Sequence, residues 1–225
     1  MNKKVIFVAG ADHSGSTLIG CILGAHPNPF RFFHVGEIHA FFRQKHKNFG
    51  NPRSASKMMY GEFWNTIDPK VGYEQAYQEI FFKSKTNTII DSSKSFIHLN
   101  NVISYCEREQ LPLHIIVTYR PFDKIWKSDI KRKHQPSKVA TNLSGYIKIT
   151  EKLSILKKYP YTIINVEQLI MNPRKMTQVL CHAVGIPYFA GKEKYWNYPS
   201  IHLYGSTTQR KHLNNPKPVM IQIEC

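Results

Sequence analysis

The chain has 225 residues, of which 42% are hydrophobic and 12% aromatic, a composition that supports a packed core and excludes a mainly disordered chain. Lys and Arg number 31 against 15 Asp and Glu, so the formal net charge is +16 and anionic partners are expected. No apolar run approaches the roughly 18 residues of a membrane span. The start of the sequence lacks a leader-type cleavage pattern, so we expect no membrane span and a cytoplasmic location.

Short apolar runs alternate with helix-type segments along the chain. The expected strands are 4–9, 32–35, 87–91, 113–119 and 161–166. The expected helices are 17–25, 38–44, 73–85, 95–109, 121–132, 138–158 and 173–184. This alternation predicts an α/β fold in which a central parallel β-sheet is flanked by helices on both faces.

The sequence contains no internal repeat and no clear domain boundary, so we expect a single domain over residues 1–225. The polar segment 45–72, with its Gly, Pro and Ser residues, is expected to be a lid or an insertion on the acceptor side. The aromatic-, Gly- and Pro-containing tail, 187–225, is expected to be mostly irregular.

An anion-binding loop is predicted where the first strand meets the first helix. The run from Gly10 to Thr17, GADHSGST, fits the pattern G-x4-G-x-T. Backbone N–H groups in such a loop surround an anion at a helix N-terminus, where the helix dipole favours negative charge. A Walker A loop carries Lys before its Ser or Thr, whereas this chain has Ser16 there, which disfavours an ordinary ATPase or kinase.

Several stretches together resemble the sulfotransferases, of bacterial type, that use 3′-phosphoadenosine 5′-phosphosulfate (PAPS). ADHSGSTLIGCILGAHPN, followed by HVGEI, is similar to their 5′-phosphosulfate loop, and TYRPFDKIWKS (118–128) is similar to their 3′-phosphate motif. The further matching stretches are IIDSSKS (89–95), NVEQLIMNPRKMTQVLCHAVGIP (165–187) and HLYGSTTQRK (202–211). The resemblance implies a P-loop-like nucleotide-binding core, PAPS as sulfuryl donor, adenosine 3′,5′-bisphosphate (PAP) as product, and no metal.

The resemblance also assigns residues to the nucleotide. It implies that the loop backbone and the hydroxyls of the last two loop residues bind the 5′-phosphate. It implies that Arg120 and Ser128 bind the 3′-phosphate, and that Arg210 closes over the nucleotide. The expected nucleotide-binding residues are Asp12, His13, Ser14, Gly15, Ser16, Thr17, Arg120, Ser128 and Arg210.

The catalytic candidates are Glu37, His13 and Lys94. The acceptor must lose a proton as it attacks sulfur, and the Glu37 carboxylate, with an ordinary pKa of about 4.3, is the expected base. His34 and His39 are alternative bases. His13 stands where many family members have a cation that stabilises the leaving phosphate, and Lys94 is the candidate to supply that charge.

Three other functions remain open. One is a family member that, because of His13, binds the nucleotide without turnover. A P-loop kinase or NTPase would use Mg-ATP, with NTIID (87–91) as a Walker B strand and Asp91 as metal ligand; otherwise Asp91 is expected to cap the following helix. A nucleic-acid-binding protein without catalysis would use the basic surface. Under the leading hypothesis, the partners are the sulfonucleotide and an anionic glycan, peptide or small-molecule acceptor, with no specific nucleic acid.

Overall fold

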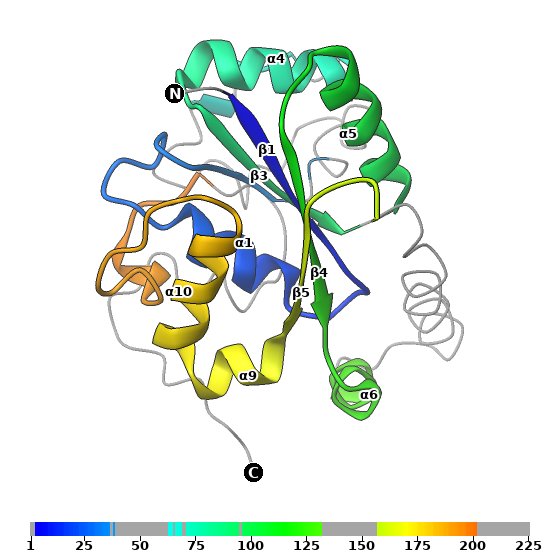
Figure 1. Cartoon of the computed structure of the whole chain (residues 1–225), viewed down its shortest axis with the longest axis vertical. Coiled ribbons are helices and arrows are strands. Elements are labelled where there is room, and N and C mark those ends of the chain that lie inside the picture. Colours follow the sequence, from blue (N-terminus) through cyan, green and yellow to red (C-terminus); the bar gives the residue numbers. More distant parts are fainter. Residues whose placement is uncertain are drawn as a thin grey trace.

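A computed structural model describes residues 3–36, 38, 63–64, 66–68, 71–94, 96–131 and 157–201. Its centre is a five-stranded sheet with the order β2-β3-β1-β4-β5, and each pair of neighbouring strands is parallel. The strands are β1 (Lys4–Ala9), β2 (Phe33–Val35), β3 (Thr88–Lys94), β4 (Leu113–Tyr119) and β5 (Tyr161–Asn165). The predicted α/β fold with a central parallel sheet is therefore confirmed (Figure 1).

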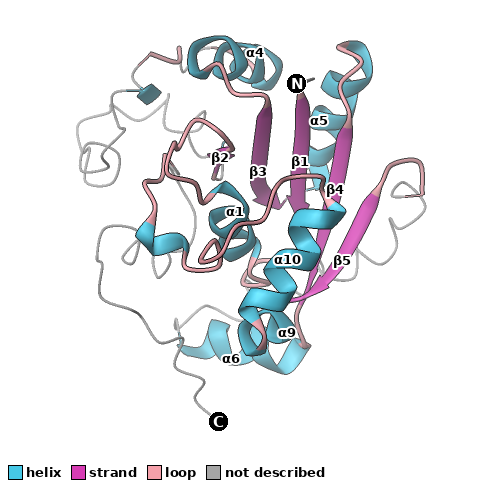
Figure 2. Ribbon diagram, turned by 60° about the vertical axis from the view of Figure 1, so that its left-hand side comes forward, coloured by secondary structure: helices cyan, strands magenta, loops and turns pink. Residues whose placement is uncertain are grey.

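Helices cover both faces of this sheet, as predicted. The described helices are α1 (Ser16–Gly24), α4 (Tyr73–Ser84), α5 (Phe96–Arg108), α6 (Phe122–Lys131), α9 (Val166–Met171), α10 (Pro173–Ala183) and the 3₁₀ turn η2 (Tyr195–Asn197). In Figure 2, α1 and α10 lie in front of the sheet and α5 lies behind it. Their apolar sides form two separate cores, one on each face of the sheet.

Successive side chains of β1 point alternately into the two cores. Val5 and Phe7 pack with α4 and α5 on one face, whereas Ile6 and Val8 pack with α1 and α10 on the other. All four side chains are fully buried. Strand β1 is the middle strand of the sheet and is buried on both faces. Its sequence is therefore a continuous apolar run, without the alternation of polar and apolar residues seen in strands that have one exposed face.

The chain leaves neighbouring strands toward opposite faces of the sheet. From β1 it enters α1 on one face, while from β3 and β4 it enters α5 and α6, which pack on the other face. Ligands of open α/β sheets bind at such a divergence, in the crevice outside the carboxyl ends of the strands. The loop between Ala9 and Ser16 lies at this position.

Two differences from the predicted elements exceed a one-residue change at an end and lie next to the site. Strand β3 extends to Lys94 and so includes polar residues that were assigned to the following loop. Helix α9 was not predicted; it begins after Asn165, whose side chain accepts a hydrogen bond of 3.0 Å from the Glu167 amide. This cap turns the chain directly from β5 into a helix.

The tail is tied to α1 by a buried lysine. The Lys192 Nζ atom donates hydrogen bonds to the carbonyl oxygens of Leu23 (2.8 Å) and Ala25 (2.6 Å), at the C-terminal end of α1. It also lies 4.8 Å from the centre of the Phe32 ring and 5.1 Å from that of Phe189. A cation here complements the negative end of the helix dipole and satisfies its last carbonyl groups.

Several predictions fall outside the described residues: the helix 38–44 beyond Ile38, most of the lid 45–72, the helix 138–158 up to residue 156, and the tail beyond residue 201. Residues 157–158 form a turn, so that last predicted helix does not reach 158. Within the described part of the tail, residues 187–201, the regular element is the 3₁₀ turn η2, and the rest is turn or irregular. Among the described helices, none combines the length and the apolar character needed to cross a bilayer.

Candidate anion-binding site

The loop between β1 and α1 is shaped by two residues in the left-handed region. His13 has φ 63° and Gly15 has φ 89°, while Ser14 between them does not have a positive φ. The Ser14 amide donates to the Ala11 carbonyl (3.2 Å), which tightens the turn just before α1 begins. Left-handed and right-handed residues in succession form the concave backbone nests that bind anions.

Both glycines that bound the loop are required by close contacts. A Cβ atom on Gly10 would lie 1.9 Å from the Thr118 hydroxyl oxygen. A Cβ atom on Gly15 would lie 2.7 Å from a methyl carbon of Val166, in addition to the positive φ at that position. The G-x4-G spacing thus reflects packing against β4 and α9 as well as backbone freedom.

A pair of buried hydroxyl groups joins the loop to β4. The Ser14 and Thr118 hydroxyl oxygens are 2.5 Å apart, and each also lies within hydrogen-bond distance of a carbonyl oxygen, that of Ala11 (2.6 Å) and that of Ala9 (3.1 Å) respectively. Each hydroxyl has one proton to donate, so two of these three contacts are hydrogen bonds at any moment. The Ser14 side chain is therefore part of the loop's internal framework. Thr118 was not singled out from the sequence, because only the fold brings it to the loop.

Ser16 and Thr17 open α1 with their side chains almost fully buried. Gly15, the N-cap residue of α1, has no side chain that could bind the free N–H groups of the first turn. This turn also contains no acidic residue. All nine residues of α1 are buried, so its dipole lies in surroundings that water screens poorly. This helix N-terminus is electrostatically suited to an anion.

Lys94 lies beside the loop at the carboxyl end of β3. Its carbonyl accepts a hydrogen bond from the Gly10 amide (3.4 Å), and its Nζ atom lies 3.5 Å from Asp12 Oδ1. The Lys94 side chain is largely buried, and its φ of 67° is uncommon for a residue with a side chain. Asp12 and Lys94 thus lie together at the edge of the loop, near the equally left-handed His13.

Arg120 approaches the same loop from the end of β4. Its NH1 group donates to the His13 carbonyl (3.3 Å), and its Nε atom donates to Glu167 Oε1 (2.7 Å). Ser128 lies two turns along α6, where it is partly buried. Glu167 is not among the residues expected from the sequence, and its contact with Arg120 places it beside the loop.

Glu37 and Arg210 lie outside the described residues, as does His39. The residues on either side of Glu37 are held by Ser93, whose buried hydroxyl donates to the Gly36 carbonyl (3.3 Å) and accepts from the Ile38 amide (3.2 Å). Ser93 immediately precedes Lys94 in β3. Both neighbours of Glu37 are therefore fixed at the carboxyl end of this strand.

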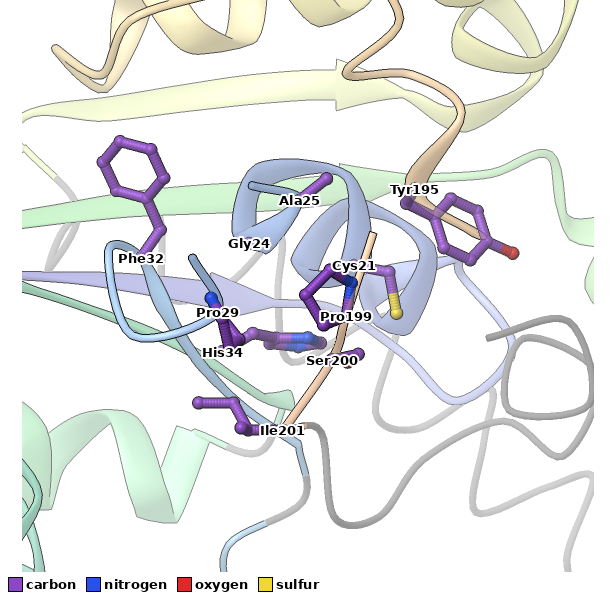
Figure 3. Close-up of a pocket in the computed structure, with 10 residues that line it drawn as sticks. All are labelled: Cys21, Gly24, Ala25, Pro29, Phe32, His34, Tyr195, Pro199, Ser200 and Ile201. Atoms are coloured by element: carbon purple, nitrogen blue, oxygen red, sulfur yellow. The ribbon is translucent and has the colours of Figure 1, made fainter. Parts of the chain in front are cut away.

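His34 is not placed to act as a base at this loop. It is buried against Gly20 and Gly24 of α1, and its Nε2 atom lies 3.0 Å from the Ser92 hydroxyl. Burial lowers the pKa of His34 to about 3, so the imidazole is neutral and weakly basic. It lines a small pocket at the C-terminal half of α1, at the opposite end of the helix from the loop (Figure 3).

This pocket is built by three segments: α1, the stretch around β2, and the tail after η2 (Figure 3). Its lining residues are Cys21, Gly24, Ala25, Pro29, Phe32, His34, Tyr195, Pro199, Ser200 and Ile201. Tyr195 is buried in the core on the α1 side of the sheet, which agrees with a packing role for the tail aromatics.

Asp91 lies within β3 and not at the start of the next helix, so the prediction that it caps that helix is wrong. Its carboxylate accepts hydrogen bonds from the Tyr77 hydroxyl of α4 and from the Ser93 amide (2.7 Å). Burial raises the pKa of Asp91 to about 6. Asp91 thus faces α4, whereas α1, which carries Thr17, covers the opposite face of the sheet.

This orientation contradicts a role for Asp91 as a metal ligand together with Thr17. A Walker B carboxylate must reach the cation beside the loop hydroxyl, and the Asp91 side chain is instead held by Tyr77 in the core. The described part of the chain contains no cluster of three or more His, Cys, Asp or Glu side chains suited to a metal ion. The absence of a metal from the reaction stays a prediction.

No protein-family model and no curated protein sequence matches the chain. Solved structures share its fold at low identity. The sulfotransferase domain from the Synechococcus PCC 7002 olefin synthase has a TM-score of 0.61 at 16% identity, over 85% of this chain and 76% of that chain. The sulfotransferase domain from the curacin biosynthetic pathway has a TM-score of 0.58 at 14% identity, over 85% and 77%.

The Deinococcus radiodurans tunicamycin resistance protein is also similar, with a TM-score of 0.51 at 13% identity over 83% of this chain and 98% of that chain. A fold can host several reactions, so these similarities concern architecture. The parallel sheet, the glycine-bounded loop at its middle strand and these neighbours show that the chain has a sulfotransferase-type α/β fold with a P-loop-like core.

Proposed function

We propose that this protein is a sulfotransferase that moves a sulfuryl group from PAPS to a hydroxyl or amine of an acceptor. The observation that carries the proposal is the hydrogen bond from Arg120 NH1 to the His13 carbonyl (3.3 Å). It brings a guanidinium to the rim of a loop that itself suits an anion. A nucleotide with phosphates on both its 3′ and 5′ positions needs two adjacent anion sites of this kind.

In this proposal the 5′-phosphate lies on the N-terminus of α1. The backbone N–H groups of residues 14–17 bind it, with the Ser16 and Thr17 hydroxyls as further donors. Arg120 and Ser128 bind the 3′-phosphate, because a guanidinium offers paired donors that match phosphate oxygens. Asp12 and His13 line the loop, and Arg210 closes over the nucleotide.

The transfer itself is an in-line displacement at sulfur. The bond between sulfur and the bridging oxygen of the 5′-phosphate breaks, and PAP leaves with the electron pair. A new bond forms between sulfur and the acceptor oxygen or nitrogen. The acceptor proton passes to the Glu37 carboxylate, whose neighbours Gly36 and Ile38 are held by Ser93.

Charge develops on the phosphate oxygen as it leaves, and cations near the loop stabilise it. Lys94 supplies this charge from β3, since its side chain reaches Asp12 at the loop edge. His13 adds to this charge in its protonated form. The step needs no metal, because PAP is a stable leaving group and the loop and cations balance its charge.

The acceptor is proposed to be a glycan, a peptide or a small molecule. The net charge of +16 favours an anionic one, because a basic surface raises the local concentration of anions. Residues 38–72 and 187–225 are the segments in which we expect the acceptor site.

A Mg-ATP kinase and a noncatalytic nucleic-acid binder are the competing functions. The kinase is disfavoured by Ser16 at the Walker lysine position and by the orientation of Asp91 toward α4. Nucleic-acid binding would fall steeply with salt and would not depend on a 3′-phosphate.

The deciding experiment compares the thermal stability of the protein with PAP, AMP and ATP·Mg²⁺ at matched ionic strength. PAP at one hundred times its Kd is expected to stabilise the folded state by about 2.7 kcal/mol. The rise should be absent with AMP and lost in Arg120→Ala. A rise with ATP·Mg²⁺ only would favour the kinase, and no specific rise would favour nucleic acid. Once an acceptor is identified, Glu37→Gln should lower kcat.

A further inference from the structure

Arg120 and Glu167 form an ion pair at the edge of the proposed nucleotide site. The Arg120 Nε atom donates to Glu167 Oε1 at 2.7 Å, and both side chains are about three-quarters buried. The two residues come from neighbouring strand ends, since Tyr119 of β4 pairs with Asn165 of β5. The pair is therefore set by the register of the sheet and not by two flexible surface side chains.

Glu167 is itself held in place. Its amide donates to the Asn165 side chain (3.0 Å), in the first turn of α9. The preceding residue, Val166, packs against Gly15 of the anion-binding loop. The start of α9 thus contacts both the loop and the guanidinium.

The bonds made by Arg120 leave one edge of its guanidinium for a ligand. A guanidinium has five N–H donors, and the hydrogen bonds to Glu167 and to the His13 carbonyl use one on Nε and one on NH1. Within the described parts of the chain, three donors, one on NH1 and two on NH2, therefore remain. A carboxylate on the Nε side fixes the plane of the group and hence the direction of these donors.

We propose that Glu167 is a positioning residue that orients Arg120 toward the 3′-phosphate of the nucleotide. This inference rests on the proposed function, because it assumes that Arg120 binds this phosphate. Glu167 makes the site selective for nucleotides with a 3′-phosphate over those with a 3′-hydroxyl. It acts through Arg120 and does not touch the ligand.

The Glu167 side chain affects binding of the 3′-phosphate in two opposite ways, which variants can separate. The Glu167 carboxylate orients Arg120 but also repels a nearby anion. Glu167→Gln keeps an oxygen that accepts from Nε and removes the charge. Glu167→Ala removes both, and Glu167→Asp keeps the charge on a side chain one methylene shorter. A positioning role predicts that Gln preserves binding while Ala and Asp weaken it.

The experiment is calorimetric titration of PAP and AMP into the wild-type protein and its variants. Glu167→Ala and Glu167→Asp are each expected to raise the Kd of PAP about tenfold, as for a lost charge-assisted hydrogen bond. Their Kd for AMP should stay within about twofold of the wild-type value. Glu167→Gln should bind PAP as tightly as the wild type or more tightly. Glu74→Gln, which neutralises an acid paired with Arg108 at the surface, is the charge-matched control.

Unchanged PAP affinity in both Glu167→Ala and Glu167→Asp would overturn the positioning role. Tighter PAP binding in Ala, Asp and Gln alike would also overturn it, because Glu167 would then sequester Arg120. If the wild-type protein and Arg120→Ala both bind PAP and AMP with equal Kd, the proposed function itself would be refuted. Since Glu167→Gln and Glu167→Asp retain polar side chains, they keep the test decisive if Glu167→Ala does not fold.

Discussion

The hydroxyl oxygens of Ser14 and Thr118 lie 2.5 Å apart in the buried space between the anion-binding loop and β4. They are 104 residues apart in the sequence, and each hydroxyl also lies within hydrogen-bond distance of a loop or strand carbonyl, of Ala11 and Ala9 respectively. The contact fixes the loop to β4 two residues before Arg120. The two anion sites of the proposed nucleotide pocket therefore share one rigid connection.

Thr118→Val removes this connection while keeping the side-chain shape. The Ser14 hydroxyl and the Ala9 carbonyl both lose a buried partner, so the free energy of unfolding should fall by about 1–3 kcal/mol. PAP should bind more weakly because the loop is less well held. Urea denaturation and calorimetric titration measure the two effects. Thr162→Val, which removes a hydroxyl 2.9 Å from His114 Nε2, is the control and should keep wild-type PAP affinity.

Gly15→Ala should disrupt the loop. It places a Cβ atom at φ 89° and 2.7 Å from Val166, so we expect a loss of about 1–3 kcal/mol from backbone strain and no stabilisation by PAP. Adding Val166→Ala should recover only part of the stability, since the strain at φ remains. Gly72→Ala is the control, because nothing lies within 4 Å of its Cβ position. Wild-type PAP stabilisation of Gly15→Ala, followed by thermal melting, would argue against this loop as the 5′-phosphate site.

Asp91 and His34 should give opposite pH dependences of stability. The folded-state pKa of Asp91 is raised to about 6, so this group binds more protons in the folded state and favours unfolding as pH rises from 4 to 6. The pKa of His34 is lowered to about 3, so the unfolded state binds more protons and stability rises with pH between 3 and 6.5. The two slopes oppose each other between pH 4 and 6.

In Asp91→Asn, the pH dependence of the free energy of unfolding should show the contribution of His34 without the opposing contribution of Asp91. Relative to the wild type, the variant is expected to gain roughly 2 kcal/mol of stability as pH rises from 4 to 7, because each pKa unit corresponds to about 1.4 kcal/mol. His34→Asn should show the reverse, losing stability relative to the wild type over the same range. Urea denaturation at half-unit pH steps measures both differences. Parallel curves for Asp91→Asn and the wild type would show that Asp91 has an ordinary pKa.

Lys192→Met should destabilise the protein strongly. It leaves the Leu23 and Ala25 carbonyls without their donor, and the loss of such buried bonds costs about 1–3 kcal/mol each. Burial lowers the pKa of Lys192 to about 8, so the lysine is mostly charged at neutral pH. Lys175→Met, at an exposed position on α10, is the control for loss of a positive charge. Equal urea midpoints for the two variants would contradict the role of Lys192 at the end of α1.

Much of the sheet follows from local patterns. The runs 4–9 and 113–119 are mostly apolar and mostly buried, and both were predicted as strands with the limits that the structure shows. Strand β3 was cut short at Asp91 because Asp, Ser and Lys are rare in strands. Their side chains are accommodated there by Tyr77, by the segment around Gly36, and by the loop.

The sequence placed Arg120 and Lys94 at strand ends, and the structure has Lys94 as the last residue of β3 and Arg120 directly after β4. What the sequence could not reveal are pairings between distant segments. Nothing in the local sequence distinguishes Thr118 from other strand residues, or Glu167 and Lys192 from other charged residues. Each acquires its role only when the sheet brings its partner close.

The bond from Lys192 to Leu23 spans 169 residues, which has a consequence for synthesis on the ribosome. At about 5–20 residues per second, α1 emerges roughly 10 to 30 s before the lysine that completes its C-terminal end. During this interval the carbonyl groups of Leu23 and Ala25 lack the lysine that binds them in the finished protein. The C-terminal end of the helix that follows the anion-binding loop is thus completed only after the segment around Lys192 has been made.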